Sequence, residues 1–156
     1  MATITPSEVP AKARNTTSPA ARLLDLLAEE GYRPHPRDPD GPFHSIDFKA
    51  EGRRFNLRIN EEDPDFVGIC LGYRLDEEPT LPPETLLRAG HDAQADAKVV
   101  KFFLDPAGEF YELQAELFLG GQPLNAHHLE RCLGALRWAA ARFAEKLRAD
   151  APLARA

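Results

Sequence analysis

The sequence is poor in cysteine and tryptophan and has no long hydrophobic run. Its 156 residues include two cysteines and one tryptophan. The cysteines, Cys70 and Cys132, are too few and too far apart for a disulfide-stapled secreted domain, and both lie in apolar patterns typical of buried free thiols. No segment approaches the roughly 18 consecutive apolar residues that a membrane helix needs, and residues 1–17 lack the apolar core of a signal peptide. These absences favour a cytoplasmic protein without a membrane partner.

A continuous basic segment is also missing. The chain carries 19 basic and 25 acidic side chains, for a formal net charge of −6. Neutralisation of phosphates supplies most nucleic-acid affinity, so an acidic chain is poorly suited to bind DNA or RNA. Arg53, Arg54 and Arg58 alternate with apolar residues, as on the solvated face of a strand. We therefore expect no nucleic-acid partner.

The local signatures of catalysis and metal binding are absent as well. There is no glycine-rich phosphate loop, no nucleophile elbow, and no EF-hand spacing around the acidic residues 61–65. His128 and Cys132 are four residues apart and would share a helix face, but Cys132 belongs to an apolar stripe and no spacing supplies further ligands. The sequence thus predicts no catalytic residues, no metal and no cofactor.

The composition that remains is that of one globular domain, with 43% hydrophobic and 28% charged residues. Residues 1–17 show no hydrophobic periodicity, and we expect a disordered tail there. We expect a frayed end at 150–156. Residues 18–149 form the predicted single domain.

Patterning within this domain predicts an α+β fold. The expected order is a helix, a three-stranded meander, a helix, a β-hairpin and a long C-terminal amphipathic helix packed on an antiparallel sheet. Ser18-Pro19 and Gly31 have the chemistry of a helix start and end. Alternation over 45–59 predicts two strands joined by a two-residue turn, with Phe48 opposite Phe55.

The third strand has large apolar residues on one face and Gly68, Cys70 and Gly72 on the other. Small residues on one face indicate either a bulge or a cleft that something approaches closely. The second helix starts at Pro82-Pro83-Glu84 and is expected to be interrupted at Gly90-His91.

The last two strands, at 98–104 and 110–119, join through residues 105–108. Of their possible registers, the pattern favours the one that pairs Phe102 with Tyr111 and Phe103 with Phe110. The final helix begins after Asn125. A single apolar stripe follows it: Leu129, Cys132, Leu133, Leu136, Ala140, Phe143 and Leu147.

This element order, over about 19–147, resembles the YbjN-like family and the wider type III secretion chaperone-like fold. The resemblance rests on the opening helix Leu23–Tyr32, the hairpin Ile46–Ile59, the hairpin Lys101–Phe110 and the final helix. It implies a homodimeric module that binds protein segments, in a chaperone-like or regulatory role. The interrupted second helix and the N-terminal tail depart from the family pattern.

Several large apolar residues lie off the predicted core: Val99, Phe103, Phe110, Phe118 and Trp138. Exposed apolar residues mark protein contacts when no other element covers them, so these are the candidate partner-binding residues. One hypothesis is a homodimer, in which Phe103→Glu yields a folded monomer. A second is a monomeric adaptor that loses its partner on Trp138→Ala. A third is a small-ligand sensor or enzyme that uses the cleft near Gly68, Cys70 and Gly72.

Overall fold

The computed structural model describes residues 17–74, 81–106 and 109–150. In chain order, the helices and strands are α1 (Pro19–Glu29), β1 (His35–Pro36), β2 (Phe43–Ala50), β3 (Arg53–Asn60), β4 (Asp63–Arg74), α2 (Pro83–Asp96), β5 (Val100–Leu104), β6 (Phe110–Phe118) and α3 (Ala126–Asp150). The strands form one antiparallel sheet in the order β1-β2-β3-β4-β6-β5. The chain has an α+β fold, as predicted.

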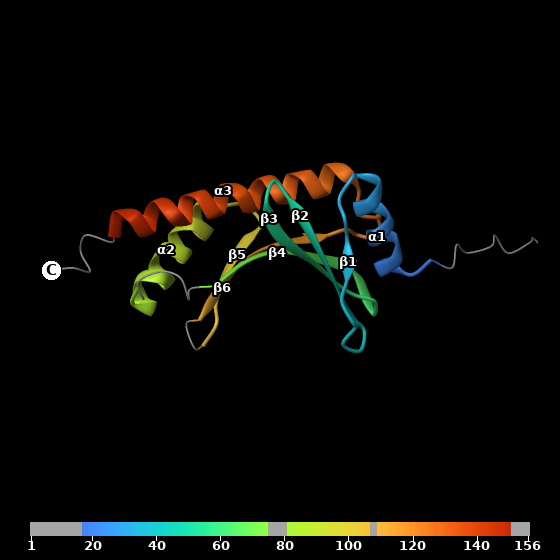
Figure 1. Ribbon diagram of the computed structural model, residues 1–156, viewed down its shortest axis with the longest axis horizontal. Helices are drawn as coiled ribbons and strands as arrows, with labels where there is room; N and C mark the ends of the chain where they lie inside the picture. Colours follow the sequence, from blue (N-terminus) through green and yellow to red (C-terminus); the bar gives the residue numbers. More distant parts are fainter. Residues whose placement is uncertain (1–16, 75–80, 107–108, 151–156) are drawn as a thin grey trace, which may run out of the picture.

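The molecule has two layers. Figure 1 shows a sheet that arches beneath the long helix α3, with α1 at the β1 end and α2 near β5. The helices lie on the convex side of the arch. No helix within the described residues covers the concave side, which we call the concave face.

Alternation of apolar residues explains why only one side is covered. Ile46, Phe48, Leu57, Ile69 and Leu113 are buried on the convex side of their strands. They pack against the apolar stripes of α1 and α3, including Leu27, Leu133 and Leu136. The predicted stripe of α3 is buried from Leu129 to Phe143. A second cluster joins α2 to α3 through Leu86, Ala89, Ala93 and Phe143.

The predicted element boundaries are confirmed where local chemistry sets them. The Ser18 hydroxyl accepts a hydrogen bond from the Ala21 amide at 3.2 Å, and the Asn125 side chain accepts one from the His128 amide at 3.0 Å. Gly31, just after α1, has a φ of 83°. Glu51 and Gly52 have φ values of 50° and 77°, as a two-residue hairpin turn requires, and Phe48 pairs with Phe55.

The predicted register of the β5–β6 hairpin is wrong by two residues. Phe102 lies opposite Leu113, and Phe103 lies opposite Glu112 rather than Phe110. A shift of two keeps every side chain on its predicted face, so the apolar pattern does not distinguish the two registers. The observed one leaves a longer connection, in which the Asp105 carboxylate accepts a hydrogen bond from the Phe110 amide at 2.8 Å.

Two further predictions need correction. Residues 34–42, whose prolines and Asp38-Pro39-Asp40-Gly41 predict turns, also contain the short strand β1, which pairs with Ile46 and Asp47 of β2. Helix α2 also continues through Gly90. A Cβ at that position would lie 2.3 Å from the Phe102 ring, so the glycine allows β5 to pack closely on the helix. The predicted disordered tail and frayed end lie outside the described residues, apart from Thr17 and Asp150.

Candidate functional site

The concave face places one row of side chains across the whole sheet. Strand pairing aligns His35, Asp47, Asn56, Cys70, Gln114 and Lys101, one residue from each strand. In the rows on either side, Gly68 pairs with Arg58 and Glu116, and Gly72 pairs with Glu112. Alternation predicts this face to be polar on the first hairpin, and the middle of the face is polar on the strands beyond it as well, apart from Cys70.

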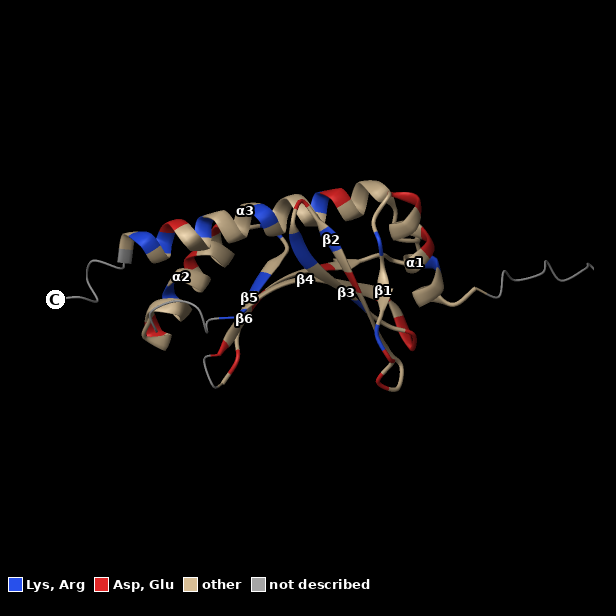
Figure 2. Cartoon of the chain, in the orientation of Figure 1, with Lys and Arg blue, Asp and Glu red and all other residues tan. Residues whose placement is uncertain are grey.

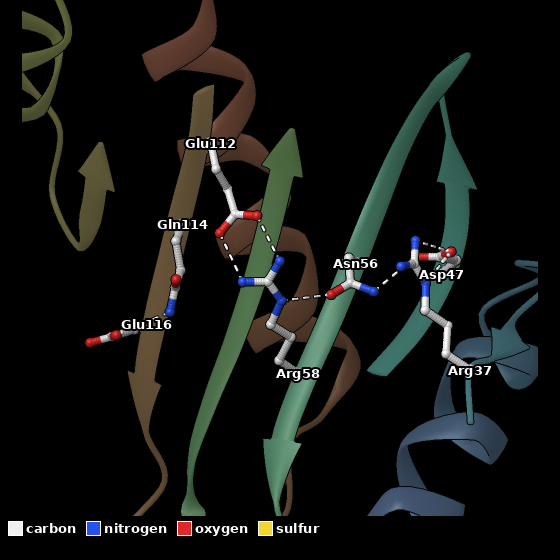
Figure 3. A network of polar contacts seen from close by, with 7 residues as sticks. All are labelled: Arg37, Asp47, Asn56, Arg58, Glu112, Gln114 and Glu116. Atoms are coloured by element: carbon white, nitrogen blue, oxygen red, sulfur yellow. Dashed lines mark hydrogen bonds and ion pairs between the residues drawn. The ribbon is translucent and has the colours of Figure 1, made fainter. Parts of the chain in front are cut away.

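These polar side chains are joined by hydrogen bonds that run along the face (Figure 3). Asp47 accepts hydrogen bonds from Arg37 and from Asn56, each at 2.8 Å. Asn56 in turn accepts one from Arg58 at 2.8 Å. Burial raises the pKa of the Asp47 carboxyl, but the bonds from Arg37 and Asn56 outweigh it, and the pKa lies below its ordinary value. The carboxylate is thus held charged.

Arg58 continues the network over β4. Its guanidinium donates two hydrogen bonds to Glu112 on β6, at 2.9 and 2.7 Å. The intervening strand carries Gly68, Cys70 and Gly72 on this face, and these small residues leave room for the arginine to reach across. On β6, Gln114 donates to Glu116, which also pairs with Lys101 of β5. The face is a preorganised array of paired charges.

The cleft predicted near the third strand is not present at Cys70. That residue is only 1% exposed, because it lies between Arg58 and Glu112 and beneath their ion pair. Burial, with a smaller contribution from Glu112, raises the pKa of the Cys70 thiol to about 12, so it is a protonated and weak nucleophile. A Cβ at Gly68 would already lie 3.0 Å from the Gln114 amide. The small residues therefore accommodate the network.

Aromatic residues lie at both ends of the concave face. Phe66 and Phe118 pair across β4 and β6, with ring centroids 5.1 Å apart. Phe103 and Phe110 lie at the other end of the face, with Phe110 two residues from the partner of Phe103. All four are exposed, from 45% for Phe103 to 68% for Phe118. Phe66 was not among the predicted residues, although it has the same parity as Gly68.

The structure divides the predicted partner-binding residues among separate surfaces. Phe110 and Phe118 occupy opposite ends of β6, roughly 27 Å apart at about 3.4 Å per residue. Val99 is exposed just before β5 and has an unusual φ of 58°. Trp138 is 46% exposed on α3, in the helical layer, and Arg142 stacks over its ring at 5.8 Å. Trp138 therefore belongs to a surface separate from the concave face.

Charge is distributed unevenly over the molecule. Figure 2 shows acidic residues at the turns along the lower rim of the sheet, and basic residues within the strands above them. Among the described residues of the concave face, basic side chains outnumber acidic ones: Arg37, Lys49, Arg54, Arg58, Arg74 and Lys101 against Asp47, Glu112 and Glu116. A chain with a net charge of −6 thus presents a positive inner surface.

No group of three or more His, Cys, Asp or Glu residues in the described ranges is arranged to hold a metal ion. Cys132 of the predicted His128–Cys132 pair is buried in the core, and burial raises the pKa of its thiol to about 11. Among the described helices, none has the length and hydropathy to span a membrane.

Comparison with known proteins gives a fold likeness and nothing on function. No protein-family model and no curated protein matches the sequence. A crystal structure of an uncharacterized protein from Methanothermobacter thermautotrophicus is similar, with a TM-score of 0.57 and 16% sequence identity. The match covers 83% of this chain and 96% of that chain. The resemblance to the YbjN-like family remains a prediction, and at this level of identity the archaeal structure shows a shared fold alone.

Proposed function

We propose that the chain is a cytoplasmic, non-catalytic protein-binding module that holds a segment of another protein on its concave face, in a chaperone-like or regulatory role. The observation that carries this proposal is a sheet face that no described helix covers, with the contacting pair Phe66–Phe118 exposed at one end and the separate side chains of Phe103 and Phe110 exposed at the other. A few residues carry most of the binding energy of a protein contact, and aromatic side chains contribute large apolar areas to such contacts.

The polar centre between these aromatic residues suits an extended segment with acidic groups. Asp47 and Glu112 are already bonded to arginines, so their desolvation costs less than that of free carboxylates. The excess of basic side chains on this face favours an acidic partner and opposes a basic one. Both features match a polypeptide whose apolar side chains reach the two ends of the face.

The edge of the sheet is less suited to binding than its face. Among the described strands, β5 pairs with β6 alone, and the amide of Phe102 donates to the side chain of Gln94 on α2 at 2.8 Å. This bond occupies a donor that a further strand would need. At the other edge, β1 has two residues. Contact through the face is therefore favoured over strand addition at either edge.

A second copy of the chain is the first partner to test, because the predicted homodimer uses Phe103, one of the exposed aromatic residues of this face. Light scattering on the purified chain measures self-association, and tagged co-purification detects a different partner. The informative variants are Phe103→Glu and Phe118→Glu, one at each end of the concave face. Trp138→Ala is the matched control, because it removes an exposed aromatic residue from the helical layer.

We expect the dimer or the captured protein to persist in Trp138→Ala and to be lost in both phenylalanine variants. Circular dichroism should show that all three variants remain folded, since the substituted side chains are exposed. Binding that survives both phenylalanine substitutions would contradict the proposal. Loss in Trp138→Ala alone would place the contact on α3, as in the adaptor hypothesis.

A further inference from the structure

A surface pocket opens at the edge of the sheet where β1 leaves β2. Strand β1 pairs with β2 at His35–Asp47 and Pro36–Ile46, and the Arg37 amide also donates to the Ser45 carbonyl at 2.9 Å, whereas β2 continues in the other direction to Ala50. The space beside the unpaired end of β2 is a pocket of about 690 Å³, within the usual size range of small-molecule sites. It is bounded by the chain that follows α1, by β1, and by the ends of β2 and β3.

Three basic side chains line this pocket, namely Arg33, Lys49 and Arg54. Lys49 and Arg54 lie directly opposite each other on β2 and β3, a placement in which like charges repel. Within the described part of the chain, no carboxylate forms an ion pair with any of the three. Lys49 and Arg54 therefore form an unfavourable pair of like charges, and an anion bound beside them would offset their repulsion.

Asp47 is the acidic residue that lines the pocket; its charge attracts Arg54 from a distance, while its two oxygens are bonded to other groups. One of its oxygens accepts from Arg37 and the other from Asn56 (Figure 3). Glu30 follows α1 and does not line the pocket. Its carboxylate would therefore repel a bound anion only from outside the pocket. The pocket thus keeps a positive balance.

The pocket also has an apolar wall. It is formed by the half-buried Tyr32, whose ring packs against the buried Phe48 with centroids 5.3 Å apart. This wall offers a surface for the organic part of a ligand, while the basic side chains offer several donors to a multiply charged oxyanion.

We propose that this pocket binds the phosphate group of a small organic molecule, with Arg33, Lys49 and Arg54 around the phosphate and Tyr32 beside the organic part. Three cations that line one pocket are more than a ligand with a single carboxylate needs, and arginine and lysine are the usual phosphate-binding residues. The site lies at the β1–β3 end of the sheet, away from Phe103 on β5. It goes beyond the proposed function because it needs no protein partner.

The test uses the full chain and two probes, inorganic phosphate and phenyl phosphate, at constant ionic strength. Amide chemical shifts of Gly31, Arg33 and Lys49 should move along saturable curves, and phenyl phosphate should bind more tightly because its ring adds contact with the apolar wall. Lys49→Glu should weaken phosphate binding about tenfold or more, since it removes a charge-assisted contact and adds a repulsive charge. Arg131→Glu makes the same charge change on α3, outside the pocket, and is the control.

Lys49→Glu also gives a readout without any ligand. It replaces a repulsive cross-strand pair with an attractive one, so the melting temperature in phosphate-free buffer should rise by roughly 1–4 °C. Saturable shifts that Lys49→Glu abolishes and Arg131→Glu preserves support the site. Shifts that never saturate, or that respond equally to both variants, would reduce the effect to general charge attraction and overturn the proposal.

Discussion

The two faces of the sheet follow the same backbone but are stabilised by different interactions. On the convex side, residues such as Leu57 and Ile69 are fully buried against the helices. On the concave side, their neighbours Asn56 and Arg58 hold each other and Glu112 through hydrogen bonds. Burial of apolar surface stabilises the first side. On the concave side, hydrogen bonds hold exposed side chains in place but add little to stability, because each of them replaces a bond to water.

This difference separates the residues that fold the protein from those available for binding. A preorganised polar face loses less side-chain entropy when a partner arrives than a face of free side chains would. The small residues of β4 allow this order, because Arg58 reaches β6 only over Cys70 and its glycine neighbours. Variants on the two sides should therefore affect stability and binding separately.

The largest expected effect is on the convex side. Leu57→Ala should lower the free energy of unfolding by about 3 kcal/mol, since it removes a fully buried side chain and leaves a cavity. Its neighbour Asn56→Ala should cost about 1 kcal/mol, because the lost bonds to Asp47 and Arg58 are partly replaced by water. Urea denaturation measures both. Equal losses would contradict the division between the two faces.

A smaller effect is expected from breaking the bridge over β4. Arg58→Ala should lower the free energy of unfolding by about 1 kcal/mol, a value reduced for solvent screening because the Arg58 side chain is 47% exposed. It should also uncover Cys70, so labelling by a thiol reagent under native conditions should become faster at that cysteine. Lys101→Ala removes an exposed partner of Glu116 and is the control, with a loss below about 0.5 kcal/mol. Unchanged labelling would show that Arg58 does not cover the thiol.

Sequence patterning predicted most of the fold because its signals are local. The Ser18 and Asn125 caps, the turn at Glu51-Gly52 and the stripe of α3 each depend on residues close together in the chain. The β5–β6 register was wrong because shifts of two residues conserve the faces. Strand β1 was missed because its two residues are too few for a detectable alternation.

The candidate site was predicted only in part. Alternation identified Phe103, Phe110 and Phe118 as facing away from the core, and the structure confirms that they are exposed. Phe110 and Phe118 were grouped because they share a face, although the predicted strand at 110–119 already places them at its two ends. The bridge from Arg58 to Glu112 joins residues 54 positions apart, and only the strand order brings them together.

The smallest expected effect concerns Val99, which lies between the end of α2 and the start of β5. Its φ of 58° is a left-handed conformation that costs a β-branched residue roughly 1–2 kcal/mol. Its side chain is 56% exposed, and its carbonyl accepts from the Glu116 amide at 3.3 Å, a bond that glycine preserves. Val99→Gly should therefore raise the melting temperature by about 1–3 °C, the relief of strain exceeding the added entropy of the unfolded chain.

Lys98→Gly is the matched control for Val99→Gly, because Lys98 is exposed and has no positive φ. It should lower the melting temperature slightly, since only the entropic cost of glycine remains. If the valine is kept at a strained position because it contacts the partner, Val99→Gly should gain stability and lose binding in the same preparation. A gain in stability with unchanged binding would remove Val99 from the contact surface, and no gain at all would show that the conformation carries no strain.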